Sequence, residues 1–227
     1  MTDVLPHKRR SDAVDNRSRI QGAARTLFSA EGLDVPLREI ARRAGVGPAT
    51  LYRHFPTKQL LIAEAFADQL RACRTIVDEG CADPDPWRGL CSVIERICEL
   101  HARDRGFTEA FLATVPGTPD ITGREYTVKA VAGLAQRAKD AGRLRPDFVV
   151  DDLILVLMAN KGIHAASDAV QVMASRRFAG LVIQAFEARP HHAPLPPPAR
   201  LGSAASRSSQ SSATIRFGTQ HKNGTIR

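Results

Sequence analysis

Four closely spaced side chains that can donate hydrogen bonds occur in the first quarter of the chain. They are Thr50, Tyr52, Arg53 and His54, and Lys58 follows four residues later. Hydroxyl, imidazole and ammonium groups bind phosphate oxygens, and a guanidinium can also read the edge of a guanine. On the outer surface of one short helix, such groups suit the major groove of DNA. The chemistry indicated by this stretch is therefore recognition of a nucleic acid.

Two short helices and a tight turn would position these groups. Residues 35–58 (VPLREIARRAGVGPATLYRHFPTK) predict one helix before the turn Gly45-Val46-Gly47 and a second helix after it. The first glycine can take the positive φ that ends a helix, and Pro48 suits the first turn of the next one. This layout is typical of a helix-turn-helix, in which one helix braces and the other enters the groove.

Amphipathic helices flank this motif on both sides. The apolar stripe Ile20, Ala24, Leu27 and Phe28 predicts a helix over about residues 17–30, and Gly32 ends it. On the other side Thr57 is a suitable N-cap for one long helix over about residues 58–79. Residues 1–13 are polar and basic, and we expect them to form a mobile arm.

The rest of the chain predicts further helices and very little else. After a break at residues 83–86, the predicted helical segments cover about 87–101, 107–115, 126–140, 149–166 and 169–188. Residues 149–166 are apolar nearly all round, which indicates burial on more than one side. Residues 190–227 contain five basic and no acidic residues and are rich in proline and serine, so we expect a disordered tail. The fold class expected is all-α, with about nine helices.

Charge and composition narrow the class of protein. Residues 1–58 carry 11 Lys/Arg against 6 Asp/Glu, whereas residues 59–189 carry 16 against 18, so the basic charge lies at the ends of the chain. This distribution suits a polyanion-binding end on a nearly neutral body. No secretory signal and no run of about 20 apolar residues is present, which predicts a cytoplasmic protein without a membrane partner. The four cysteines then read as reduced thiols.

The motif and the preceding helix together resemble the DNA-binding domain of the TetR (tetracycline-repressor) family of bacterial regulators. The resemblance is dense over residues 14–62, and the run Leu-Tyr-Arg-His-Phe at 51–55, followed by Lys58, carries most of it. A weaker resemblance to the regulatory domain of the family covers GRLRPDF at 142–148. The TetR resemblance as a whole implies an N-terminal three-helix helix-turn-helix domain and a C-terminal helical ligand-binding and dimerisation bundle at 63–189. It also implies no enzymatic activity and no cofactor.

The same resemblance implies a role for each residue of the motif. Tyr52 and His54 would contact mainly phosphate, and Arg53 would read a guanine edge. Lys58 would add charge to a helix N-terminus that already suits phosphate. The complete predicted DNA-binding set is Arg38, Pro48, Ala49, Thr50, Tyr52, Arg53, His54 and Lys58. One departure concerns Val35-Pro36-Leu37, where the family usually has a serine or threonine that caps the helix and binds a phosphate.

For the C-terminal bundle the resemblance implies a homodimer, a near-palindromic double-stranded DNA operator and a small-molecule effector that releases it. Helices at 149–166 and 169–188 are the candidates for the dimer interface. Asn160 and Lys161 are possible polar contacts of the effector. The candidate ligand-binding residues, each of a type and position that favours core over pocket, are Trp87, His101, Phe107, Phe111, Tyr126, Met158 and His164.

An alternative is a DNA-binding regulator that senses redox state or a metal through its cysteines, or one without a small-molecule effector. Cys91, Cys98 and His101 fall on one helical face. However, seven residues of helix span about 10.5 Å, which is too far for the two thiols to bind one zinc ion. No metal site is therefore predicted. No catalytic motif is present either, since the G-x-S-x-G, H-E-x-x-H and glycine-rich phosphate-loop patterns do not occur.

Overall fold

The described part of the chain is helical, and this confirms the predicted all-α fold. The computed structural model describes residues 5–112, 123–190 and 193–198. Within these ranges there is no strand, and one isolated antiparallel bridge joins Leu144 to Glu187. The ten helices there are α1 (Leu5–Glu31), α2 (Leu37–Ala44), α3 (Pro48–His54), α4 (Lys58–Ala65), α5 (Ala67–Ala82), α6 (Pro86–Arg103), α7 (Arg105–Leu112), α8 (Arg124–Asp140), α9 (Val150–Lys161) and α10 (Asp168–Phe186).

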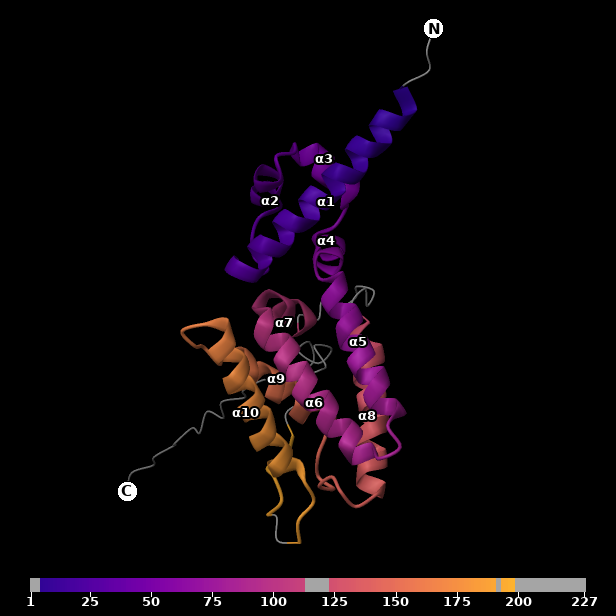
Figure 1. Ribbon diagram of the computed structural model, residues 1–227, viewed down its shortest axis with the longest axis vertical. Helices are drawn as coiled ribbons and strands as arrows, with labels where there is room; N and C mark the ends of the chain where they lie inside the picture. The colour runs from indigo at the N-terminus through magenta and orange to yellow at the C-terminus, as the bar shows by residue number, and fades with distance from the viewer. Residues whose placement is uncertain (1–4, 113–122, 191–192, 199–227) are drawn as a thin grey trace, which may run out of the picture.

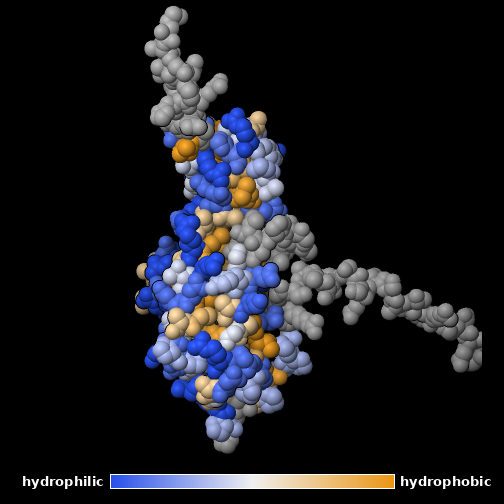
Figure 2. Space-filling view, turned by 90° about the vertical axis from the view of Figure 1, so that its right-hand side faces the viewer, coloured by the Kyte–Doolittle hydropathy of each residue, from blue (hydrophilic) through white to orange (hydrophobic). Residues whose placement is uncertain are grey.

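The molecule is elongated, with α1–α4 at one end and α5–α10 at the other (Figure 1). Helix α1 crosses the small unit and packs against α2, α3 and α4. Its stripe of Ile20, Ala24 and Phe28 is completely buried, as is Phe55 at the end of α3. A side view shows this narrow unit on a broader body, with hydrophilic residues over most of the visible face (Figure 2).

Helix α1 begins earlier than the apolar pattern predicted. The helix starts at Leu5 instead of near residue 17, so the expected mobile arm at 1–13 is helical from Leu5 onward, and residues 1–4 lie outside the described ranges. Proline is tolerated in a first helical turn, and no proline or glycine follows Pro6 until Gly22. Apolar periodicity marks only the part of a helix that packs, and this part begins with Ile20. In Figure 1 the first turns of α1 extend beyond α3.

The prediction of a single long helix after Thr57 is wrong, because the structure has two helices there, α4 and α5. Phe66, with φ −110° and ψ 18°, separates α4 from α5. No proline or glycine causes the break. The Phe66 ring is buried between Phe28 of α1 and Phe107 of α7, with centroids 6.3 and 6.1 Å away. Tertiary packing of this ring therefore accompanies the change of helix direction, and the local sequence contains no signal for it.

Helix α6 forms the centre of the larger unit and packs against α5, α8, α9 and α10. Its inner residues Leu90, Ile94 and Cys98 are completely buried. The carbonyl oxygen of Cys98 accepts a hydrogen bond from the side-chain amide of Asn160 of α9 at 2.9 Å. The Ser175 hydroxyl of α10 shares its one proton between this oxygen at 3.0 Å and Asn160 Oδ1 at 2.8 Å. These buried bonds fix both helices against α6. The Asn160 amide therefore makes a structural contact with α6, whereas the sequence suggested it as a contact of the effector.

Helices α9 and α10 are shorter than predicted, and α10 presents a different face to the core. The apolar spacing of residues 169–188 predicts one buried stripe of Val170, Ala174, Phe178, Leu181, Val182, Ala185 and Phe186. In the structure Val170 and Leu181 are exposed, whereas Ser175 and Ala179 are completely buried. Small residues at the crossing allow α10 to approach α6 closely. Val170, Met173 and Leu181 point outward, away from the core of their own chain.

The start of the predicted disordered tail has a defined position. Arg145, which is almost fully buried, donates to the carbonyl oxygen of Ala193 at 3.1 Å and pairs with Asp147 at 2.5 Å. Asp147 in turn accepts from the backbone N–H of Leu195 at 2.9 Å. The Arg145 guanidinium and this N–H lower the pKa of Asp147 to about 2. Residues 193–198 are thus bound to the α8–α9 loop, and the remainder of the tail, 199–227, lies outside the described residues.

Within the described residues, no helix combines the length and the apolar composition that a bilayer crossing requires.

Candidate nucleic-acid interface

The turn between α2 and α3 has the geometry expected from its glycines. Gly45 ends α2 in the left-handed region at φ 65°, and the N–H of Val46 donates to the carbonyl oxygen of Ala41 at 3.0 Å. Val46 is half-buried against the core. Gly47 then caps α3, and Pro48 occupies the first turn, where no N–H is needed. The turn therefore fixes α3 against α2 with few conformational alternatives.

Helix α3 buries one side and exposes the side that carries the predicted DNA contacts. Leu51 is buried in the core, as is Phe55 just after the helix. Tyr52 is 53% exposed, and Arg53 lies beside it in solvent. Pro48 and Ala49 are also exposed, whereas Thr50 and His54 are half-buried. The predicted contacts of this helix are thus available on one short segment.

Several cations around α3 carry no compensating carboxylate. Arg42 pairs with Glu39 on its own helix at 2.5 Å, and this contact is the first cause of the lowered pKa of Glu39. Within the part of the chain that the structure describes, no ion pair forms at Arg38, Arg43, Arg53 or Lys58. Lys58 lies at the first position of α4, where Thr57 caps the helix through Leu60 N–H at 3.1 Å. Unpaired positive charge therefore gathers on α2, α3 and the start of α4, as phosphate binding requires.

The start of α2 lacks the serine or threonine cap that the TetR family usually has, as the sequence Val35-Pro36-Leu37 indicated. Pro36 is the N-cap residue, and no side chain caps the helix. The first backbone N–H groups of a helix have no partner within the helix, so those of Leu37 and Arg38 can face a phosphate directly. Loss of the hydroxyl thus removes one contact while leaving the backbone amides of this helix end available.

Arg17 supports the interface from behind, and the sequence reasoning missed this role. Its guanidinium donates to the carbonyl oxygen of His54 at 3.2 Å and pairs with Glu64 of α4 at 2.6 Å. It also lies 4.6 Å from the centre of the Phe55 ring. Arg17 therefore connects α1, the end of α3 and α4. Its partners are 37 and 47 residues away, so no local pattern indicated the contact.

His54 is more restricted than a free surface histidine. Its Nε2 atom is buried without a hydrogen-bond partner. Burial first, and then the positive charges of Arg53 and Arg17, lower the pKa of His54. The ring is therefore neutral near pH 7 in the free protein. An approaching phosphate would favour the protonated ring that binds it.

The predicted ligand-binding residues do not form one group. His101, Phe107 and Phe111 lie together, with ring centroids 4.8 and 5.4 Å from His101. The other four lie elsewhere. Tyr126 is on the outer side of α8, where its hydroxyl donates to Asp78 at 2.7 Å. Met158 and His164 are exposed on α9 and in the loop after it, respectively. The structure therefore does not bring all seven residues together.

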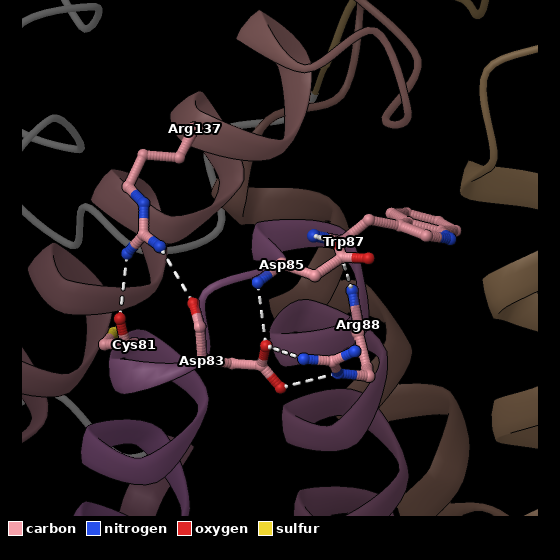
Figure 3. Close-up of polar contacts among 6 residues, drawn as sticks. All are labelled: Cys81, Asp83, Asp85, Trp87, Arg88 and Arg137. Atoms are coloured by element: carbon pink, nitrogen blue, oxygen red, sulfur yellow. Dashed lines mark hydrogen bonds and ion pairs between the residues drawn. The ribbon is translucent and has the colours of Figure 1, made fainter.

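Trp87 lies at the opposite end of α6 from His101, about 21 Å along the helix axis. There the turn between α5 and α6 is held by a polar cluster (Figure 3). Arg137 of α8 donates to the carbonyl oxygens of Cys81 and Asp83 at 2.8 and 3.1 Å. The Asp85 carboxylate caps α6 through the N–H of Trp87 at 2.9 Å. This cluster closes the distal end of the bundle, and we assign it a structural role.

The environment of His101 is the most unusual in the larger unit. Its Nδ1 atom lies 3.0 Å from the hydroxyl oxygen of Thr108, and the tautomer of the ring decides which of the two groups donates. The same hydroxyl lies 3.1 Å from the carbonyl oxygen of His101 and 3.3 Å from that of Asp104. The Nε2 atom of His101 is buried without a partner. Burial lowers the pKa of His101 to about 3, so the ring is neutral.

Comparison with known sequences supports these structural features. A sequence model described as "Bacterial regulatory proteins, tetR family" matches residues 20–65, from the first buried stripe of α1 to the end of α4. An HTH-type transcriptional regulator of Staphylococcus aureus is 46% identical over 50 residues. That match covers 22% of this chain and 27% of the relative, so the chain spans about a quarter of the length of the curated relative.

Solved structures extend the similarity to most of the chain. A TetR transcriptional regulator from Streptomyces coelicolor is 30% identical, with coverage of 76% of this chain and 98% of that chain and a TM-score of 0.47. A ketosteroid transcriptional regulator of Mycobacterium tuberculosis is 18% identical, with coverage of 76% and 95% and a TM-score of 0.57. The second comparison shows that the fold is shared.

Together, the helical fold, the exposed face of α3 and these relatives define a DNA-binding transcriptional regulator of the helix-turn-helix class. The chain belongs to the TetR family of bacterial regulatory proteins.

Proposed function

We propose that the protein is a cytoplasmic homodimeric repressor that binds a near-palindromic operator and is released from it by a small molecule. The observation that carries the DNA-binding part is the outward face of α3, where Tyr52 and Arg53 are exposed beside cations without an ion-pair partner. In this proposal α1–α4 form the DNA-binding domain, and the helices from α5 onward form the regulatory domain. Arg38, Pro48, Ala49, Thr50, Tyr52, Arg53, His54 and Lys58 are the proposed contacts.

Replacing Arg53 by alanine is expected to weaken operator binding by about 1–3 kcal/mol, since a guanidinium that binds a guanine edge at two points provides that much discrimination. The measurement is fluorescence anisotropy with duplexes from the neighbourhood of the coding region, at several salt concentrations. Arg71→Ala is the matched control, because Arg71 pairs with Asp68 on the surface of α5. Equal affinity of wild type and Arg53→Ala would exclude a base-reading role, and binding without duplex preference or salt dependence would contradict the operator proposal.

The outward apolar residues of α9 and α10 support the dimer. Leu155 and Met158 are exposed on α9, and Val170, Met173 and Leu181 are exposed on α10. Met173 is 66% exposed and Leu181 is 56% exposed, which is unusual for apolar side chains of this size. Two such helices from each subunit can pack as a four-helix bundle around a twofold axis.

Replacing Leu181 by glutamate is expected to convert the dimer to monomers, because a carboxylate would then be buried without a partner at the interface. Sedimentation velocity at micromolar concentration measures the change. Leu195→Glu is the control, since Leu195 is 44% exposed and lies outside both helices. A Leu181→Glu protein that sediments like wild type would show that this face is not the interface.

His101, Phe107 and Phe111 are the proposed centre of effector binding. The unpartnered Nε2 atom of His101 is costly in a core, and a hydrogen-bonding group of a bound molecule would remove this cost. Trp87, Tyr126, Met158 and His164 are not retained in this proposal because they lie away from this group. Thermal-shift screening of metabolites would identify the molecule, since a ligand that binds only the folded state raises its apparent stability.

The alternative of a sensor that acts through cysteines has less support. Burial raises the pKa of Cys73 and of Cys98 to about 12, and burial is also the first cause that raises the pKa of Cys91 to about 11. A thiol reacts as its thiolate, so these shifts oppose reactivity. In the described residues, no group of three or more His, Cys, Asp or Glu is arranged to hold a metal ion.

A further inference from the structure

The helix-turn-helix unit (α1–α4) contacts the bundle at a second place besides the α4–α5 connection. Helix α7 packs against α1, and the two backbones approach at Gly106. A Cβ atom at this position would lie 2.5 Å from the carbonyl oxygen of Phe28 and 2.8 Å from the Cα atom of Ser29. No larger residue fits there without displacement of α1. The contact is therefore a close backbone docking, which fixes the distance between the two helices.

Asp104 connects this docking to three helices. Its Oδ1 atom accepts from the hydroxyl of Ser29 on α1 at 2.9 Å and from the N–H of Phe107 in the first turn of α7 at 3.0 Å. Its Oδ2 atom accepts from the side-chain amide of Gln69 on α5 at 3.4 Å. One carboxylate thus connects the end of α1 to both α5 and α7.

Aromatic side chains also connect α1 to α7. Phe28 of α1, Phe66 at the break and Phe107 of α7 stack in a row, and Phe107 continues to the ring of His101. Any tilt of α1 relative to α7 must therefore disturb both the hydrogen bonds of Asp104 and this row. Two independent sets of contacts restrict the same motion.

We propose that Asp104 is a positioning residue for operator binding. Through Ser29 it holds the helix-turn-helix unit at one angle on the bundle, and in the dimer this angle sets the spacing of the two α3 helices. The inference rests on the proposed twofold dimer. Half-sites one helical turn apart require a spacing of about 34–36 Å, and one inserted base pair adds about 3.4 Å and a rotation of about 35°. A helix-turn-helix unit that is held at one angle must therefore bind the duplex with the inserted base pair more weakly.

The test uses the full-length chain and a duplex that the wild-type protein selects from a random pool. Binding is measured to this duplex and to one with a base pair inserted at its centre. Ser29→Ala removes the α1 partner of Asp104 and leaves the bond to the N–H of Phe107 intact. We expect Ser29→Ala to bind the selected duplex about five- to tenfold more weakly, which corresponds to the net contribution of one typical hydrogen bond. We also expect its penalty for the insertion to be smaller than that of wild type.

Two further variants separate positioning from folding. Thr26→Ala removes a hydroxyl that bonds only within α1, to the carbonyl oxygen of Gly22 at 2.9 Å, and is expected to behave as wild type. Asp104→Ala is expected to reduce the insertion penalty as Ser29→Ala does, whereas Asp104→Asn is expected to restore it. An asparagine oxygen can accept from Ser29 and Phe107, and its amide can donate to the buried Gln69 Oε1, which has no partner.

Each outcome decides the proposal. An insertion penalty for Ser29→Ala equal to that of wild type, or a wild type without any penalty, would overturn the positioning role of Asp104. A wild type that selects no duplex would instead contradict the operator proposal itself. The positioning role of Asp104 would be established by smaller insertion penalties for Ser29→Ala and Asp104→Ala, together with wild-type behaviour of Thr26→Ala and Asp104→Asn.

Discussion

Replacing Gly89 by alanine destabilises the bundle by about 1–3 kcal/mol, because an added methyl group has no room at the crossing of α5 and α6. A Cβ atom at Gly89 would overlap the carbonyl oxygen of Gly80 and lie 3.1 Å from the Cβ atom of Asp83. The obstructing oxygen belongs to the backbone, so rotation of a side chain cannot relieve the overlap. The two helices must move apart, and the contacts made by the α5–α6 turn must move with them.

Urea-induced unfolding at neutral pH measures this effect. Gly133→Ala is the control, since Gly133 is also helical but nothing lies within 4 Å of its Cβ position. There alanine is expected to stabilise the protein by about 0.5–1 kcal/mol, because alanine favours helix more than glycine does. The two substitutions should therefore have opposite signs. Equal effects at both positions would contradict the close crossing seen at Gly89.

Acidification from pH 7 to pH 5 is expected to cost about 2 kcal/mol of stability through His101 alone. The unfolded side chain has an ordinary pKa of about 6.5, whereas burial lowers the folded pKa to about 3. Between these values the unfolded state binds the proton and the folded state does not, so stability falls as the pH falls through this window. Above pH 6.5 both states are neutral, and the contribution of His101 is constant.

Urea unfolding of wild type and His101→Leu at several pH values isolates this contribution. The lowered pKa of His54 gives wild type and variant the same additional slope, as do the carboxylates with lowered pKa. The difference between the two proteins therefore reports His101. We expect the variant to lose about 2 kcal/mol less than wild type over this range. Parallel pH profiles for the two proteins would contradict a neutral, buried His101.

The helix-turn-helix was predictable because its signals are local. The positive φ of Gly45, the proline at the start of α3 and the Thr57 cap each act within a few residues, and the structure has all three. The support that Arg17 gives to α3 was not predictable in this way. It depends on where α1 and α4 pack, which no pattern within α1 reveals.

The candidate effector site shows a different limit. Apolar and aromatic residues on consecutive helices look alike in a sequence, whether they face a common pocket, the core or solvent. His101 and Phe107 come together because α7 turns back on α6, whereas Trp87 lies at the other end of the same helix. For α10 the apolar stripe was recognised, but the periodicity cannot tell a face packed on its own chain from one available to a partner.

The outward face of α9 and α10 also affects how the regulator responds to its own abundance. If two copies must associate through Leu155, Met173 and their neighbours before both α3 helices can reach the operator, then at concentrations below the dimer dissociation constant the amount of binding-competent protein rises with the square of the chain concentration. A twofold drop in synthesis would then lower the competent species about fourfold. These few exposed side chains, on the helices farthest in sequence from the DNA-binding unit, would make the switch between free and occupied operator steeper than the contacts to DNA alone could make it.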